Sequence, residues 1–246
     1  MDVDSWRESD NGPLNAAELE IYNSLRFTRP SSGQLEQKRS SIRNALAPAG
    51  NRETELPLVN VSGTLGRRRS IRLLHNPISL EQLAKFINAS GLNPHREAPH
   101  NASTGGLASL VPLLQLNSVT GLVPGLYLPT TRGVQLIAPT NTVLRAITRS
   151  VGASLGSNHA PAVIILILAE WDRISERYEN ATLVSALWDA GVVLGAAYNA
   201  ATELQLAGCA SSKITPNAVA TVLGVPATTL GHIATFALGG PAPNAT

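Results

Sequence analysis

The chain has 246 residues, of which 43% are hydrophobic, 15% are charged and only 4% are aromatic. This composition supports a large core built from aliphatic side chains. The formal net charge of +2 is too small for a general nucleic-acid binder, so we expect no nucleic-acid partner. A single cysteine, Cys209, excludes an internal disulfide and a cysteine-rich metal site.

Targeting and membrane signals are weak. The N-terminus lacks the basic region and the apolar region that open a secretory signal. The best apolar run, residues 160–169, is too short to span a bilayer. We therefore expect a cytoplasmic protein without a membrane partner.

Positive charge is unevenly spread along the sequence. Eleven of the 19 basic residues lie before position 73, and the densest cluster is Arg67-Arg68-Arg69-Ser70-Ile71-Arg72. No acidic residue occurs between positions 98 and 169, whereas Arg132, Arg145 and Arg149 do. An electropositive middle segment would tolerate an anionic ligand.

The cluster at residues 67–72 has three interpretations. The first is a solvated charge run. The second is a nucleic-acid patch, which would need more basic residues and interleaved aromatic side chains. The third is a phosphate clamp for a bound cofactor, because arginine is a planar fork that binds phosphate through two hydrogen bonds.

The polarity of the sequence divides the chain into two parts. Residues 1–55 are polar and predict a flexible or partner-docking N-terminal arm, with a short amphipathic helix near residues 19–27. Residues 56–246 predict a folded domain, which begins with a short extended stretch at 56–59. A helix is expected at 63–74, and it would carry the arginine cluster.

The rest of the sequence predicts an α+β fold. Ser79 and Gln82 have the spacing of a capping box at the start of an amphipathic helix. A helical turn is expected at 107–110, and the apolar run at 162–168 is typical of a buried central strand. Helices and strands are mixed without strict βαβ alternation. Further strands are predicted at 111–117, 126–128, 134–137 and 233–238, and further helices at 141–150, 181–206 and 216–223.

Motifs for self-contained chemistry are missing. The sequence has no phosphate-binding loop, no Gly-x-Gly-x-x-Gly and no Gly-x-Ser-x-Gly. Its five histidines lack metal-ligand spacing, so no metal site is expected. Any chemistry must then come from a bound organic cofactor.

Several segments, in order, resemble a known family. Residues 68–72 resemble the Arg-x-Ser-x-Arg segment that opens the FMN-dependent nitroreductase fold, and Pro77-Ile78-Ser79 and the capped helix follow as in that superfamily. The chain looks most like the azoline dehydrogenases, which oxidise thiazoline and oxazoline rings to thiazoles and oxazoles in ribosomally made peptides. The resemblance covers residues 56–241. Its other matching segments are residues 102–109, Pro124-Gly125-Leu126-Tyr127, Arg177-Tyr178, residues 187–201, Leu223-Gly224-Val225 and Leu238-Gly239.

The resemblance implies a mixed, mainly antiparallel sheet flanked by helices, in an intertwined homodimer with FMN at the interface. It also assigns cofactor contacts. The FMN phosphate and ribityl chain would be held by Arg68, Arg69, Ser70 and Arg72. Backbone amides would approach the isoalloxazine edge at Ser103, Thr104, Gly105 and Gly106. A further flavin contact would come from Ser211, Ser212 and Lys213.

The family's catalytic Lys-Tyr pair is matched by Arg177-Tyr178. Tyr178 would serve as a base or an orienting hydroxyl, while Arg177 stays charged at ordinary pH and is a poor base. The implied function is oxidation of azoline rings in a leader-bearing peptide, with hydride passing to flavin N5 and a cyclodehydratase or another modification enzyme as partner.

Two alternatives remain open at the level of the sequence. One is a catalytically degenerate, flavin-free scaffolding partner in a peptide-modification complex, which the loss of the family lysine favours. The other is a general NAD(P)H-dependent nitro or flavin reductase.

Overall fold

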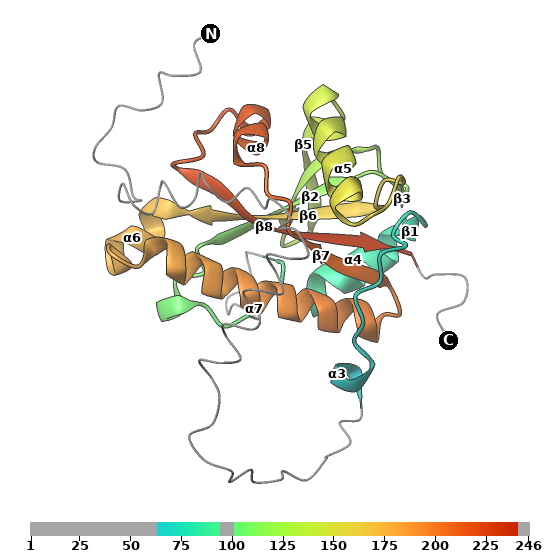
Figure 1. Cartoon of the computed structure of the whole chain (residues 1–246), viewed down its shortest axis with the longest axis horizontal. Helices are drawn as coiled ribbons and strands as arrows, with labels where there is room; N and C mark the ends of the chain where they lie inside the picture. The colour runs from blue at the N-terminus through green and yellow to red at the C-terminus, as the bar shows by residue number, and fades with distance from the viewer. Residues whose placement is uncertain (1–62, 94–100, 241–246) are drawn as a thin grey trace, which may run out of the picture.

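The computed structural model describes residues 63–93 and 101–240, and its centre is a six-stranded sheet (Figure 1). The strand order is β5-β4-β2-β6-β8-β7, and every neighbouring pair is antiparallel. The α+β fold with a mainly antiparallel sheet is therefore confirmed. The strands are β2 (Leu110–Leu116), β4 (Gly125–Thr130), β5 (Gly133–Pro139), β6 (Val163–Glu170), β7 (Ala207–Ser211) and β8 (Leu230–Gly239).

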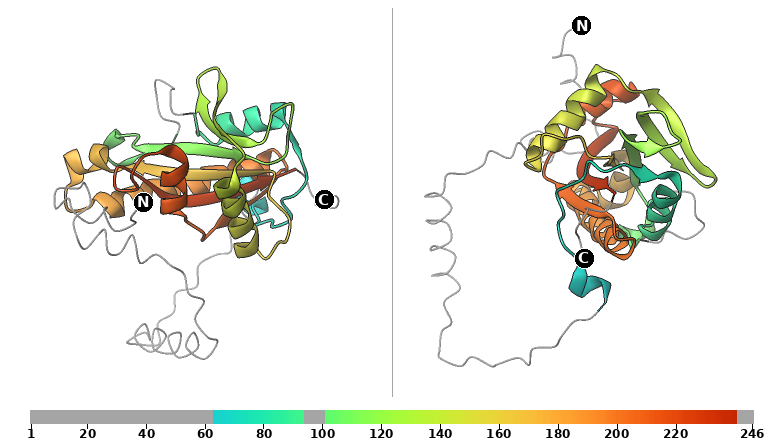
Figure 2. Two further views of the ribbon diagram at one scale, coloured as in Figure 1. Left: turned by 90° about the horizontal axis from the view of Figure 1, so that it is seen from above. Right: turned by 90° about the vertical axis from the view of Figure 1, so that its right-hand side faces the viewer.

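Helices cover both faces of the sheet (Figures 1 and 2). One face is covered by α4 (Leu80–Ala89) and α7 (Thr182–Glu203), with α6 (Trp171–Tyr178) leading into α7. The other face is covered by α5 (Thr142–Ser154) and α8 (Pro216–Leu223). The remaining elements are the short helix α3 (Thr64–Arg67), the 3-10 turn η1 (Thr104–Gly106), and a parallel pair of two-residue strands, β1 (Ile78–Ser79) and β3 (Val119–Thr120).

The core has two halves that meet at β6. Ile165 and Ile167 belong to the cluster under α4 and α7, whereas Ile164 and Leu166 belong to the cluster under α5 and α8. Successive side chains in a strand point to opposite faces, and here both faces are covered. The strand therefore reads as a continuous apolar run, and the predicted central strand is confirmed.

The capping residues in the sequence correctly predicted the start of α4 and the end of α8. The Gln82 amide N–H donates to Ser79 Oγ at 3.1 Å, and the Ser79 N–H donates to Gln82 Oε1 at 2.8 Å, which completes the predicted capping box of α4. Helix α8 ends as expected at Gly224, whose φ of 66° is left-handed. Thr215 precedes α8, but its side chain makes no cap hydrogen bond.

The helix predicted at 63–74 is wrong beyond Arg67. Residues 68–76 have no helical structure, and we call them the strap. The Ile71 N–H donates to Gly208 O of β7 at 3.0 Å, and Leu74 O accepts from the Ala162 N–H at 2.8 Å. These bonds to residues distant in sequence replace helical ones, and the Leu74 side chain is buried in the hydrophobic core.

Four elements were missed from the sequence: the two-residue strands β1 and β3, strand β7 and helix α6. Strand β7 reads Ala-Gly-Cys-Ala-Ser, which has low β-propensity. It needs small residues because a Cβ at Gly208 would lie 2.7 Å from the ring of Phe236. Helix α6 is short and half of its residues are charged, and its only buried residues are Trp171 and Ile174.

Some predictions fall outside the described residues. These are the arm at 1–55, its helix near 19–27 and the extended stretch at 56–59. Among the described helices, α7 is long and apolar enough to cross a membrane by length and composition alone. Ten of its residues are buried in the fold, and core helices of soluble proteins satisfy the same criterion.

His232 on β8 is a buried, neutral histidine. Its Nδ1 accepts from the Thr215 N–H at 3.0 Å, so Nε2 carries the proton and faces Ala234 O and Thr235 Oγ1 at 3.0 and 2.9 Å. Burial lowers the pKa of His232 from 6.5 to about 4, although the bond to Ala234 O opposes the shift. The imidazole therefore ties the segment before α8 to β8 in its uncharged form.

We predict that the fold loses stability as pH falls below 6.5. In the unfolded chain His232 then binds a proton, whereas in the folded protein its lowered pKa keeps it neutral. The free energy of unfolding should drop by about 2 kcal/mol between roughly pH 6.5 and pH 5, above the range in which carboxylates titrate. Urea denaturation at several pH values measures this. The His232→Gln variant, which keeps one acceptor and one donor, should show a flat profile, and an equal slope in both proteins would contradict the prediction.

Candidate functional site

Part of the arginine cluster lies against the C-terminal half of α7. The Arg68 guanidinium sits 5.2 Å from the ring centroid of Tyr198, and the Ser70 hydroxyl lies 3.1 Å from the Tyr198 hydroxyl. The Tyr198 hydroxyl also accepts a hydrogen bond from the Ala210 N–H of β7 at 2.8 Å. Tyr198 therefore links the strap to the sheet, and it was missed by the sequence reasoning.

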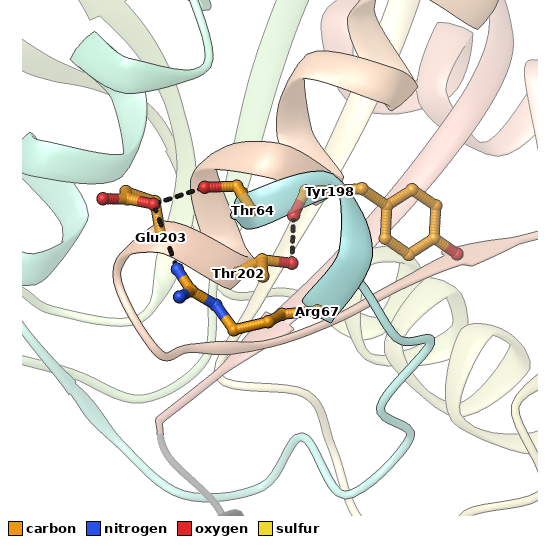
Figure 3. A network of polar contacts seen from close by, with 5 residues as sticks. All are labelled: Thr64, Arg67, Tyr198, Thr202 and Glu203. Carbon is orange, nitrogen blue, oxygen red and sulfur yellow. Dashed lines mark hydrogen bonds and ion pairs between the residues drawn. The ribbon is translucent and has the colours of Figure 1, made fainter. Parts of the chain in front are cut away.

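Only one arginine of the cluster is paired with an acid among the described residues. Glu203 lies 3.7 Å from Arg67 and accepts from the Thr64 hydroxyl at 2.5 Å (Figure 3). In the same view Tyr198 points away from this group. Arg69 donates to the carbonyls of Gly66 and Arg68, at 3.3 and 3.0 Å.

The other arginines keep their charge free for an anion. Arg68, Arg69 and Arg72 form no salt bridge within residues 63–93 and 101–240. Arg69 and Arg72 are exposed, and Arg68 is half-buried. Arg68 and Ser70 give the surface beside Tyr198 donors of the kind that a phosphate prefers.

The candidates after β7 are arranged differently. The Ser211 hydroxyl lies 2.6 Å from the Ser154 hydroxyl of α5 and accepts from the Lys213 N–H at 3.0 Å. Its side chain therefore meets the helix on the opposite face of the sheet from Tyr198. Ser212 and Lys213 are exposed. The structure thus brings Arg68 and Ser70 together at Tyr198. Ser211, by contrast, contacts Ser154 on the other face of the sheet.

The glycine-bearing segment is held against the N-terminal half of α7. The N–H and the hydroxyl of Thr104 both donate to Asp189 Oδ1, each at 2.7 Å, and Asp189 is only 5% exposed. The Ser103 hydroxyl accepts from the Ala108 N–H at 3.1 Å. The turn thus lies at 104–106 and not at 107–110 as predicted. Asp189 was also missed, although a lone acid on the inner face of an alanine-rich helix was the available signal.

The candidate catalytic pair lies directly on this segment. Arg177 Nη1 donates to Gly105 O at 3.0 Å. A Cβ at Gly105 would lie 2.5 Å from the Tyr178 hydroxyl. The Arg177 guanidinium also lies 6.0 Å from the centroid of the Tyr178 ring. The structure therefore joins Arg177 and Tyr178 to Gly105, which are 72 residues or more apart in sequence.

Six of the candidates lie at two points along α7: Thr104, Gly105, Arg177, Tyr178, Arg68 and Ser70. The first is the Asp189 end, with Thr104, Gly105 and the catalytic pair. The second is the Tyr198 end, with Arg68 and Ser70. Nine residues separate Asp189 from Tyr198, which is about 13 Å along a helix axis. Helix α7 is therefore the scaffold of the candidate site.

A small cavity lies beneath the glycine segment. Its volume is about 100 Å³, and its lining includes Ser109, Asp189, Leu92 and Ile167. The Ser109 hydroxyl is buried and has no hydrogen-bond partner among the described residues. Small-molecule sites usually measure about 300–1,000 Å³, so this cavity is too small for a flavin. Arg68 and Tyr178, which are both half-buried, do not line it.

Comparison with known proteins places the fold in a family. Residues 65–239 match the nitroreductase family model, and the chain belongs to the nitroreductase family. Members of this family are flavin-dependent oxidoreductases. A search of the curated proteins found no match.

Solved structures show the same fold at low identity. A chain of the Escherichia coli microcin synthetase McbBCD complex, with truncated pro-MccB17 bound, is 16% identical, with a TM-score of 0.63 over 91% of this chain and 86% of that one. A candidate nitroreductase from Ralstonia eutropha is 18% identical, with a TM-score of 0.60 over 80% of this chain and 89% of that one. One from Anabaena variabilis is 20% identical, with a TM-score of 0.60 over 73% of this chain and 37% of that one.

We predict that Gly105→Ala destabilises the protein more than Gly106→Ala. Both glycines have positive φ, 60° and 70°, so alanine at either position costs about 1 kcal/mol in backbone strain. Only at Gly105 does the new Cβ meet the Tyr178 hydroxyl, which should add at least about 1 kcal/mol. Urea denaturation gives the two free energies of unfolding.

The Tyr178→Phe change supplies the control. It removes the nearest atom, so it should recover most of the difference in a Gly105→Ala background and change little in a Gly106→Ala background. Equal losses for both alanine variants would show that Tyr178 does not rest on Gly105.

Proposed function

We propose that this protein is an FMN-dependent oxidoreductase that oxidises azoline rings to azoles in a ribosomally made peptide. The observation that carries the proposal is the packing of Tyr178 on Gly105, which sets the candidate catalytic hydroxyl on the segment that would border a flavin. The proposal also draws on the family membership and on the order of the matching segments along the chain.

The donors present suit FMN. Arg68, Ser70 and Arg72 would hold its phosphate, because their charges and hydroxyl have no acidic partner among the described residues. The Thr104 N–H is engaged by Asp189, so the turn at 104–106 would border the ring system as a fixed wall. When bound, FMN supplies the two-electron acceptor that takes a hydride from the substrate.

Oxidation of an azoline removes a hydride and a proton from the ring. We assign the proton to Tyr178, which either takes it as the phenolate, after passing its own proton to solvent, or orients through its hydroxyl the water that takes it. Arg177 cannot serve as a base because its guanidinium stays charged. Its bond to Gly105 O makes it a positioning residue that fixes the turn against α6.

The proposal includes partners. The E. coli complex has a peptide bound, and by analogy we propose a leader-bearing peptide substrate and a cyclodehydratase or related modification enzyme for this chain. Such a substrate is made by ribosomes, so the reaction would take place in the cytoplasm. A second copy of this chain would cover the surface along α7 and complete the flavin site.

The decisive experiment uses the full chain loaded with FMN and a synthetic azoline peptide, with and without a cyclodehydratase. Each oxidised ring should lose the mass of two hydrogen atoms, and Tyr178→Phe should slow the loss at unchanged flavin occupancy. Mass spectrometry detects the change. Intact azolines with fully loaded protein would refute the assignment of the reaction.

The same preparation tests the two alternatives. A flavin-free scaffold is favoured by the structural role of Arg177, and it predicts a colourless protein that refuses added FMN yet binds a partner enzyme. A general reductase predicts that NAD(P)H bleaches the bound flavin without oxygen. Full flavin occupancy argues against the first alternative, and an unchanged spectrum argues against the second.

We predict that Arg68→Ala or Arg72→Ala weakens FMN binding by about 1–3 kcal/mol, the scale of a lost charge-assisted hydrogen bond. Fluorescence titration of the apoprotein with FMN measures the affinity. Arg132→Ala is the matched control, because this arginine is exposed in the turn after β4. Unchanged affinity in both cluster variants would place the flavin phosphate elsewhere.

We predict that Trp188→Lys dissociates the proposed homodimer. Trp188 is 68% exposed on α7, and Val184, Leu187 and Val192 are exposed on the same helix. A charge there would oppose burial against a second copy. Light scattering after gel filtration gives the mass. Leu80→Lys, on α4, should leave the dimer intact, and a wild-type chain that is already monomeric would contradict the prediction.

A further inference from the structure

A second cavity lies on the opposite side of the sheet from Tyr198. Its volume is about 430 Å³, within the range of small-molecule sites. Helix α5 contributes Thr142, Arg145, Thr148 and Arg149 to its lining, and the end of β2 leads to Asn117. Neither the arginine cluster nor the catalytic pair lines this cavity.

Its two arginines lie one helical turn apart on α5. Arg145 and Arg149 are both exposed, and neither forms a salt bridge within the described residues. Like charges at this spacing repel each other. No acid occurs in the chain from position 99 to 168, so no carboxylate on this helix offsets the repulsion between the two arginines. An anion held between the two guanidinium forks would remove this repulsion.

A polar residue behind the lining, Gln115, fixes the wall of the cavity through Thr148. Gln115 is only 2% exposed, and its Nε2 donates to Leu144 O at 2.7 Å and to the Thr148 hydroxyl. Asn117 Oδ1 lies 3.2 Å from the same hydroxyl, and Asn117 Nδ2 donates to Pro161 O at 2.8 Å. These bonds hold the wall beneath the arginines before any ligand arrives, which lowers the entropic cost of binding.

The available donors point to one ligand chemistry. Arg145 makes a single weak internal contact, from Nη2 to the Thr142 hydroxyl at 3.4 Å. The remaining guanidinium N–H groups of Arg145 and Arg149 are donors of the kind that oxyanions accept in pairs. No carboxylate lines the cavity. The lining thus offers positive charge and hydroxyl groups, without a competing negative charge.

We infer that this cavity binds the oxyanion group of a small molecule, a phosphate or a carboxylate, between Arg145 and Arg149. The site is independent of the proposed flavin chemistry, because it uses other residues on the other face of the sheet.

The test is calorimetric titration of the full chain with inorganic phosphate and, separately, with succinate, at an ionic strength held constant with sodium chloride. The wild-type chain should bind at least one of them saturably, and the tighter one identifies the source of the oxyanion. The double variant Arg145→Gln/Arg149→Gln should lose roughly tenfold or more in affinity, as expected when charge-assisted bonds are removed.

Two controls locate the site. Arg132→Gln, from the same acid-free segment but outside the cavity, should bind like the wild type. Arg68→Gln/Arg72→Gln should also retain binding at the cavity. If the double variant fails to fold, Arg149→Gln alone should still weaken binding severalfold.

Three results would overturn the inference. The first is the absence of saturable binding of either anion by the wild-type chain. The second is loss of binding in the Arg68→Gln/Arg72→Gln variant while Arg145→Gln/Arg149→Gln still binds. The third is an equal loss in Arg132→Gln, which would indicate a general effect of net charge.

Discussion

The burial of β6 on both faces is the constraint on which the rest of the fold depends. A strand covered on both faces needs a helical layer on each side, and α7 and α5 provide them. Burying this aliphatic run is favourable by about 25 cal/mol for each Å² of apolar surface. Aromatic side chains contribute little to the sequence, so the helices approach closely through alanine, as Ala190, Ala197 and Ala201 show.

Helix α7 combines this structural role with the organisation of the candidate site. Its inner face is apolar except for a few polar groups, and Asp189 and Tyr198 hold segments that are remote in sequence. A buried carboxylate is costly unless it is hydrogen-bonded, and the two bonds from Thr104 offset that cost. The chain therefore fixes the glycine turn and the strap with the same rigid element, at a spacing set by the helix.

The sequence predicted the parts of this fold that depend on local or periodic signals. The central strand, the capped helix α4 and the long helix α7 follow from hydrophobic periodicity and cap chemistry. The strap did not, because residues 68–76 are held by bonds to β7 and to Ala162, just before β6, that no local pattern encodes. The family resemblance singled out Tyr178 and Gly105 separately, but their contact and the anchoring by Asp189 depend on tertiary packing.

Strand β7 forms one edge of the sheet, and the strap and Tyr198 form hydrogen bonds with its outer side. Gly208 O accepts from the Ile71 N–H, and the Ala210 N–H is bound by Tyr198. Strand β5 forms the other edge, where Leu136 and Ile137 are 42% exposed. An open edge is a template for pairing with another chain, whereas a covered edge flanked by charge is not. Among the described residues no strand pairs with the outer side of β5, whereas the strap and Tyr198 make the β7 edge, beside the candidate site, less available for pairing.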